Sequence, residues 1–551
     1  MSNYLTPDVY TEEIPLLPPS VAGVSTAVPA FIGYTEKAPK NKEEDDASLR
    51  PVRISTLLEY KEIFGKAQSA SFVVEVENKD AITGVKVTPP QSTLYHALDL
   101  YFKNGGGDCY VISIGSYVDY SEAKAKDAFL KGLEALSKED EPTLIMLGEA
   151  TKLPADDYHE ICTQALMQCN ELKDRFCIFD IKKDDLGGTN FRDGIGNNNL
   201  KYGAAYTPYL QTSLTYNYED ADVTVKQLTS TEDSGFEVEY QGIKITYSGS
   251  DSETPKFRIN GGSGTTLEFS VSGSNLLSIK NVPDAGLAVS SIVEAWEAFT
   301  DKKGFDMVVL DDSSIVNQTA GTAGQELIKN GESESLESYK GGQSALYNKI
   351  VNQLAKEKMI LPPSAAIAGA YATTDRERGV WKAPANISLN AIIAPVVKIT
   401  SNDQERLNVD ATSGKSINAI RSFVGKGTLV WGARTLEGNS NEWRYISVRR
   451  LFNMIEESTK KASYFAVFEP NDPSTWLKVK AMIESFLYNV WQQGGLVGTT
   501  EEQAYFVNVG LGKTMTQQDV LEGRMIIEIG IAATRPAEFI ILKFSHKLQE
   551  V

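Results

Sequence analysis

The sequence GRMIIEIGIA at residues 523–532 determines how the C-terminal region of this chain is built. Its β-branched residues predict a strand, and Arg535-Pro536-Ala537-Glu538 then turns the chain into a second apolar stretch, FIILKF at 539–544. From about Asn508 to Lys547 we therefore expect a strand, a polar turn, a long apolar strand and a final strand that runs off the end of the protein. A final strand with unpaired backbone groups needs the edge of another sheet.

The N-terminus is also expected to be an extended arm without a partner strand of its own. Tyr4–Ile14 is extended by its proline, is too short to be a domain, and is followed by Pro15, Pro18 and Pro19. Since an isolated strand is unstable in water, two arrangements are open: each arm folds back on its own domain, or each completes a sheet in another subunit. The residues expected to form arm strands are Val9, Tyr10, Thr11 and Glu12 at the N-terminus, and Phe539, Ile540, Ile541, Leu542, Lys543 and Phe544 at the C-terminus.

Composition predicts a large water-soluble protein. A length of 551 residues suggests roughly three to four domains, and 42% hydrophobic residues suffice for real cores. No run of about 18 apolar residues could span a membrane, so we expect no direct membrane insertion. The first residues lack a basic segment and an apolar segment, and so we expect synthesis in the cytoplasm without a signal peptide.

Sequence fragments that resemble motifs for catalysis or cofactor binding lack the residues that those motifs require. Two fragments, at 413–416 and 511–514, resemble the end of a nucleotide-binding loop, but Val409 and Val507 stand where its first glycine is required. The four cysteines have no Cys-x-x-Cys spacing and the three histidines are scattered, so neither a disulfide framework nor a zinc site is expected. We therefore predict no enzyme activity, no cofactor and no metal.

Charge is distributed unevenly along the chain. Residues 341–551 contain 24 Lys and Arg and 20 Asp and Glu, whereas residues 1–340 contain 30 and 53. A strongly acidic part is poorly suited to nucleic acid, whose phosphates favour Lys and Arg, so no nucleic-acid partner is expected. The mildly basic C-terminal part is suited to an acidic protein partner.

Strands alternate with helices through the first part of the chain. This alternation predicts an α/β layer with a mostly parallel sheet, within an α+β multidomain protein of mixed sheets and helices. The expected strands are Val28–Tyr34, Cys109–Ile114, Thr143–Leu147, Arg175–Asp180 and Ala204–Leu210, and the expected helices are 91–103, 121–137 and Asp156–Leu172.

Around Ser213 the composition changes, and the sequence continues in short alternating runs that are rich in Ser, Thr, Gly and Asp. Hairpin patterns such as Phe236–Tyr240 with Ile243–Tyr247 predict a β-rich insertion. Two further helices are expected at about 446–460 and 473–493. The predicted division is an N-terminal arm (1–20), an α/β core (21–213), a β-rich inserted surface domain (214–342), a C-terminal domain (343–530) and a C-terminal arm (531–551).

Several motifs of the C-terminal half together resemble a known family, the sheath subunit of contractile phage tails and related injection systems. Tyr4–Ile14, Ala97–Gly107 and Arg175–Asp180 are also similar, so the resemblance covers most of the chain except 214–342. The motifs are LPPS (361–364), AYA (370–372), DRERGVWKAPAN (375–386), GKGTLVWGARTL (425–436), WRYISVRRL (443–451), FEPND (468–472) and PAEFI (536–540).

The resemblance implies a mechanical role that needs no nucleotide. Subunits of this family are expected to stack as six-membered rings around an inner tube, joined by their arms, in an extended helix that shortens and drives the tube through a target envelope. It implies as partners further copies of the chain, the inner tube protein, baseplate and tail-terminator proteins, and sheath paralogues. The expected location is a phage tail or a phage-like particle released by lysis, and the sequence does not separate these two.

The resemblance also implies positions for features that are otherwise unremarkable. The acidic insertion would lie on the outer surface, and the C-terminal domain would face the inner tube. Two other classes of function are open: an enzyme, which would need a pocket with convergent titratable groups, and a non-contractile, adhesin-like surface-binding protein, which would use the β-rich insertion. The expected tube contacts are Lys478, Lys480, Arg449, Arg450, Lys460 and Lys461, and for the arginines the alternative of internal salt bridges is open.

Overall fold

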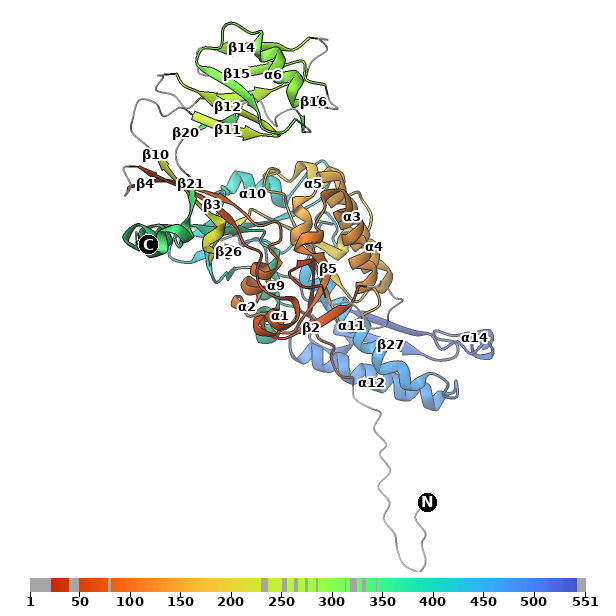
Figure 1. Ribbon diagram of the computed structural model, residues 1–551. Coiled ribbons are helices and arrows are strands. Elements are labelled where there is room, and N and C mark those ends of the chain that lie inside the picture. Colours follow the sequence, from red (N-terminus) through yellow and green to blue (C-terminus); the bar gives the residue numbers. More distant parts are fainter. Residues whose placement is uncertain are drawn as a thin grey trace, which may run out of the picture. The chain divides into compact units, whose positions relative to one another are not determined.

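A computed structural model shows the chain as two compact units (Figure 1). The first unit contains residues 1–68, 91–215 and 358–551, and the second contains 69–90 and 216–357. The structure describes residues 21–38, 49–77, 81–228, 236–249, 255–261, 266–272, 276–283, 286–312, 314–317, 325–329, 333–342 and 344–542.

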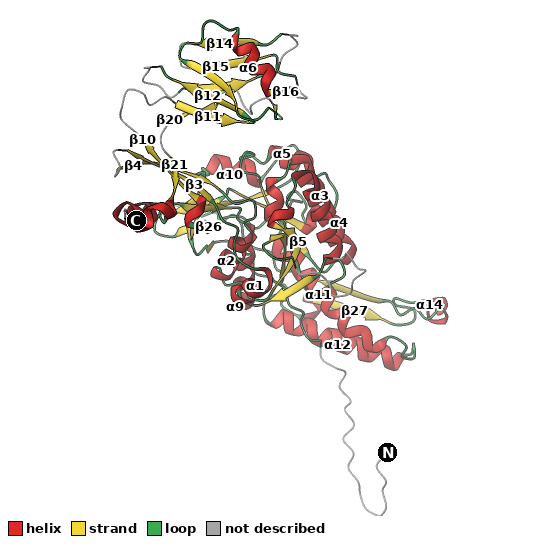
Figure 2. Ribbon diagram, in the orientation of Figure 1, coloured by secondary structure: helices red, strands yellow, loops and turns green. Residues whose placement is uncertain are grey.

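A mixed sheet forms the centre of the first unit (Figure 2). Its middle strands β5, β1, β6, β7, β8 and β25 run parallel, while β2, β26 and β23 pair antiparallel at its edges. All residues of β1 are buried, as expected for a strand covered by helices on both faces. The order is β2 (Pro51–Ile54), β5 (Cys109–Ser116), β1 (Pro29–Thr35), β6 (Leu144–Met146), β7 (Phe176–Asp180), β8 (Gly203–Thr207), β25 (Ile417–Phe423), β26 (Gly427–Val430) and β23 (Ile387–Ser388).

Helices cover this sheet, and their sequence patterns explain their positions. Helix α4 buries Tyr158, Ile161, Ala165 and Leu166, the face that its 3.6-residue periodicity predicts. Helix α9 is buried nearly all round, which small residues such as Ala and Gly allow. The expected α/β alternation is thus confirmed. The helices are α1 (Leu57–Phe64), α2 (Leu94–Lys103), α3 (Glu122–Leu136), α4 (Ala155–Leu172), α5 (Thr189–Gly194), α9 (Ser364–Arg378) and α10 (Ser401–Asn408).

The C-terminal part of the first unit consists of two long helices and a hairpin (Figure 1). Helix α12 begins at Pro473, and the carboxylate of Asp472 caps it by accepting from Thr475 N at 2.9 Å. The hairpin packs on α12 through Val507, Ile529 and their neighbours. The elements of this part are α11 (Ile446–Ala462), α12 (Pro473–Gln492), α13 (Glu501–Ala504), β27 (Tyr505–Val509), α14 (Gln517–Leu521) and β28 (Ile527–Ile531).

The first unit also contains a separate three-stranded sheet, with the strands β22 (Lys358–Leu361), β9 (Leu210–Thr215) and β24 (Ile392–Pro395).

The second unit begins with a small sheet that the sequence pattern did not predict. Its hairpin, β3 (Ser71–Glu77) and β4 (Ala81–Thr88), belongs to neither the α/β core nor the main sheet, because β3 pairs in parallel with β10 (Val223–Leu228). β10 in turn pairs antiparallel with β21 (Ser333–Ser335). Helices α7 (Tyr339–Gly342) and α8 (Ser344–Leu354) complete this core, so the unit extends to Glu357 rather than ending at 342.

Between β10 and β21 the chain forms a separate β-rich core around Trp296 and Phe257. The expected hairpin of Phe236–Tyr240 and Ile243–Tyr247 is present, with Val238 opposite Ile245. The elements are β11 (Phe236–Tyr240), β12 (Ile243–Tyr247), β13 (Lys256–Ile259), β14 (Glu268–Ser272), β15 (Leu276–Lys280), β16 (Leu287–Ala288), α6 (Val289–Glu297), β17 (Phe305–Val309), β18 (Ile315–Val316), β19 (Gln325–Glu326) and β20 (Ile328–Lys329).

Candidate functional site

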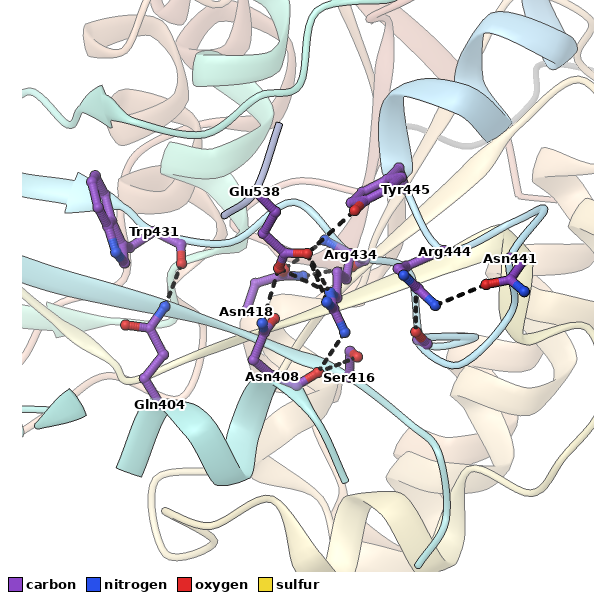
Figure 3. Close-up of polar contacts among 11 residues, drawn as sticks. Gln404, Asn408, Ser416, Asn418, Trp431, Arg434, Asn441, Arg444, Tyr445 and Glu538 are labelled. Atoms are coloured by element: carbon purple, nitrogen blue, oxygen red, sulfur yellow. Dashed lines mark hydrogen bonds and ion pairs between the residues drawn. The ribbon is translucent and has the colours of Figure 1, made fainter. Parts of the chain in front are cut away.

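A charged pair fixes the start of the C-terminal arm (Figure 3). The guanidinium of Arg434 donates from Nε to Glu538 Oε1 at 2.9 Å and from Nη2 to Glu538 Oε2 at 2.6 Å. Asn408 Nδ2 donates to the same carboxylate at 2.9 Å, and the Tyr445 hydroxyl lies 3.3 Å from it. We call these four residues the clasp. Bidentate contacts of this kind are among the strongest side-chain hydrogen bonds.

The body of the protein holds Arg434 through contacts that do not involve the arm. Arg434 N donates to Asn418 Oδ1 at 2.8 Å, and Asn418 Nδ2 donates back to the Arg434 carbonyl at 2.8 Å. Arg434 Nη1 also donates to the Asn408 carbonyl at the end of α10. Burial raises the pKa of Glu538, but the hydrogen bonds from Arg434 and Asn408 outweigh it and leave this pKa below its ordinary value. The carboxylate is therefore charged at neutral pH.

After the clasp, every described residue of the arm is exposed. Phe539 and Ile540 are 70% and 80% exposed, and Ile541 and Leu542 are similarly open to solvent. These four residues form no strand within this single chain, and a cavity of about 580 Å³ lies between the start of the arm and Trp431 and Tyr445. Lys543 and Phe544, like the N-terminal arm residues Val9, Tyr10, Thr11 and Glu12, lie outside the described residues.

The hairpin of β27 and β28 has sheet edges available for further strands. Within the described residues the two strands form a sheet by themselves, with Val507 opposite Ile529. One face packs on α12, and on the other the ring of Phe506 lies against Gly530, where a Cβ atom would meet a ring carbon at 2.1 Å. A two-stranded sheet is marginal by itself and gains stability from added strands.

The lysines predicted to contact a tube lie at or near the surface. Lys478 is exposed on α12, and Lys480 is half-buried with its Nζ 3.4 Å from Glu484. Lys460 and Lys461 lie at the end of α11, and both contact the carboxylate of Glu457. The pair of Lys480 with Glu484 is partly exposed on both sides and contributes little to stability, whereas Lys460 and Lys461 neutralise the buried carboxylate of Glu457.

The two predicted arginines are inside the protein. Arg449 is 2% exposed, stacks on Trp443 with its Cζ 4.3 Å from the ring centroid, and contacts Glu456 at 2.9 Å. Arg450 is 3% exposed and donates to both oxygens of the buried Asp375 carboxylate. Their guanidinium groups are occupied by internal partners, because burying a charge requires pairing it. We therefore assign these two arginines an internal structural role.

The place where open α/β sheets usually bind ligands is filled by the chain itself. Ligands bind beyond the carboxyl ends of the strands, where the strand order reverses, here between β1 and β6. The Glu149 carboxylate there accepts from Tyr34 N at 3.0 Å and from Leu94 N at the start of α2 at 2.7 Å. The cavity that remains has about 20 Å³, which is room for about one water molecule.

Metal-binding clusters and membrane-spanning helices are both absent from the described residues. No group of three or more His, Cys, Asp or Glu side chains there could hold a metal ion. In the same residues, no helix is long and apolar enough to cross a bilayer.

Comparison with known proteins agrees with this description. Residues 439–547 match the phage tail sheath C-terminal domain, which includes the hairpin and the arm. Over 99% of its length the chain also aligns with 99% of a sheath protein solved in the contracted state of an extracellular contractile injection system, PVC, with 25% identity and a TM-score of 0.55. The chain is a homologue of contractile sheath proteins.

Two other relatives of this sheath homologue support the assignment. The anti-feeding prophage helical sheath in its contracted state is 27% identical, with 98% of this chain and 99% of that chain covered and a TM-score of 0.55. The tail sheath protein of Vibrio phage KVP40 is 28% identical over 185 residues, which is 33% of this chain. The matched region spans only 26% of that phage protein. The sheath homologue is therefore a component of a phage tail or phage-like particle.

Proposed function

We propose that the chain is the structural subunit of a contractile sheath, which polymerises as stacked six-membered rings around an inner tube and contracts to drive that tube through a target envelope. The observation that carries this proposal is the alignment of nearly the whole chain with contracted sheath proteins. Contraction needs no nucleotide, because the work comes from a difference in interface free energy multiplied over many subunits. Its role is mechanical rather than enzymatic.

The arms join neighbouring subunits under this proposal. Phe539–Leu542 expose apolar side chains that water disfavours, and the hairpin of β27 and β28 offers sheet edges to extended segments. The N-terminal arm, with Val9–Glu12, adds a strand in the same way. The C-terminal arm of one subunit and the N-terminal arm of another thus complete the hairpin sheet of a third.

The remaining partners follow from the same function. The inner tube protein contacts the exposed lysines of α12, Lys478 and Lys480, and those at the end of α11, Lys460 and Lys461. Baseplate and tail-terminator proteins close the two ends, and sheath paralogues fit the same ring positions. The β-rich insertion lies on the outer surface. The particle is assembled in the cytoplasm and released by lysis.

Removing the arms tests the proposal. A variant that lacks residues 1–18, and a second in which Phe539–Leu542 are replaced by Ser, should remain folded but form no tubes, whereas the full chain forms tubes visible by electron microscopy. Leu521→Ser, which removes an equally exposed apolar side chain from α14, is the matched control and should form normal tubes. Tubes of normal length from both arm variants would show that the arms are not the connectors.

A further inference from the structure

The last hydrogen bonds along the described part of the C-terminal arm are those of Glu538. The Glu538 side chain is 21% exposed and bound on several sides, whereas Phe539 immediately after it is 70% exposed. Before Glu538, the last hydrogen bonds of the chain are those of Thr534, from its N to the Gly495 carbonyl at 3.2 Å and from its hydroxyl to the Gly494 carbonyl at 2.9 Å. Among the described residues, 535–537 make no hydrogen bond.

We propose that the contact between Arg434 and Glu538 is the pivot of the C-terminal arm: it ties the arm to its own subunit at residue 538 and lets the chain change direction from Phe539 onward. The inference rests on the proposed sheath function for its purpose but not for its geometry. Arg434 and Glu538 are positioning residues, which set where the arm leaves the subunit.

The length of chain released by opening the clasp explains why such a pivot matters. If the hydrogen bonds of Glu538 break, the next residue held by hydrogen bonds is Thr534. The four residues 535–538 are then released together with the rest of the arm. At about 3.3 Å per residue, the arm then gains roughly 13 Å of slack. A connector with that much slack no longer transmits a rotation of one subunit to its neighbour. A fixed point at residue 538 keeps the connection short while subunits turn.

The surroundings of the clasp suit a pivot. The cavity of about 580 Å³ beside it is lined by Phe539 and Ile540 on the arm and by Trp431 and Tyr445 on the body, so the chain after Glu538 has space to swing. The guanidinium is held by the Asn408 carbonyl and by the fixed backbone of Arg434, so it does not follow the arm. Tension on the arm therefore acts on the hydrogen bonds that the Glu538 carboxylate accepts from Arg434, Asn408 and Tyr445.

Electron paramagnetic resonance of a spin label on Ala537 tests the pivot in the free subunit. Ala537→Cys supplies one exposed thiol, and the four natural cysteines are buried, so the label attaches at 537 alone. We compare this parent with Glu538→Gln, which removes the charge, and with the double replacement Arg434→Met and Glu538→Met, which removes the pair without leaving a buried charge unpaired. Glu522→Gln, which loses an exposed pair with Arg524, is the control.

The label is expected to be slow in the parent and the control and to move as in a flexible loop in both clasp variants, and the double replacement should keep the melting temperature of the parent. A label that stays slow in both clasp variants would overturn the inference. In assembled tubes, the urea midpoint for disassembly should fall in both clasp variants, while the midpoint for subunit unfolding should stay unchanged in the double replacement. Equal disassembly midpoints would also overturn the pivot, whereas failure of the full chain to form tubes would contradict only the sheath function.

Discussion

Asp180 is a buried carboxyl group at the carboxyl end of β7. Its Oδ1 accepts from Ser364 N at the start of α9 at 2.7 Å, and its Oδ2 has no hydrogen-bond partner in the described residues. Burial raises its pKa to about 7, although the bonds from Ser364 act in the opposite direction. Between about pH 4 and pH 7 the folded protein therefore keeps a proton that the unfolded chain has lost, and the free energy of unfolding falls as pH rises through this window.

Asp180→Asn should remove this pH dependence. The amide keeps an oxygen for Ser364 N and carries no charge, so the variant should be more stable than the parent at pH 8 but not at pH 4. Each unit of pKa shift corresponds to about 1.4 kcal/mol, so the gain at pH 8 should be on the order of a few kcal/mol. Melting temperatures at both pH values check this, with the exposed Asp184→Asn as control. A gain of equal size at pH 4 and pH 8 would contradict the assigned proton.

The positions of single side chains could be predicted from the sequence only where a local pattern constrains them. As tube contacts, Arg449 and Arg450 would have to be exposed, whereas the structure buries both. A signal against exposure was available for Arg450, because it lies four residues after Ile446 and four before Met454, on the apolar stripe of α11. The pair of Arg434 and Glu538 could not be predicted, because 104 residues separate its members and no local pattern links them.

Elements were predictable where their signal is local. α4 and the hairpin of β11 and β12 carry their own periodicity or turn, so both were expected. The hairpin of β3 and β4 was not, because it is stabilised by β10, which lies far along the chain. The sequence between two such distant strands contains no pattern that predicts their pairing. The second unit therefore includes residues 69–90 in addition to the predicted insertion.

The pairing of β10 with β21 predicts how the β-rich core between them can be removed. Thr224 lies opposite Ser335 and Lys226 opposite Ser333, so the chain enters and leaves through neighbouring antiparallel strands about 5 Å apart. Replacing residues 230–331 by a short Gly/Ser linker should leave a folded protein that still forms tubes, as electron microscopy would show.

Removing residues 217–338 instead is the informative comparison. That deletion takes away β10 and exposes Phe72, Val74 and Val76, which are buried against it, so this variant should be insoluble or unstable. Aggregation of the smaller deletion would show that the core between β10 and β21 supports the remaining chain.

At the scale of the whole molecule, the exposed lysines of α12 should affect the assembled state rather than the fold. Lys478→Glu with Lys480→Glu should change the free energy of unfolding by less than about 1 kcal/mol, including a small repulsion between the new residue at 480 and Glu484. The yield of extended sheath around its tube should fall, and empty contracted sheath should increase.

Electron microscopy of particles counts the two forms. Lys124→Glu with Lys131→Glu, which changes two exposed lysines on α3, is the control for altered net charge. A normal proportion of extended, tube-filled sheaths in the α12 variant would exclude Lys478 and Lys480 from the tube contact. Lys460 and Lys461 would then be tested next, since Arg449 and Arg450 are buried.

The neighbouring strands β10 and β21 also have an evolutionary consequence. Recombination that exchanges the coding sequence between them can replace the β-rich core by another of any length, because the two ends always meet at the same pair of strands. Lineages that share the rest of the chain can thus acquire, lose or trade this part in one event. We expect its length to vary among homologues far more than the length of the segments on either side.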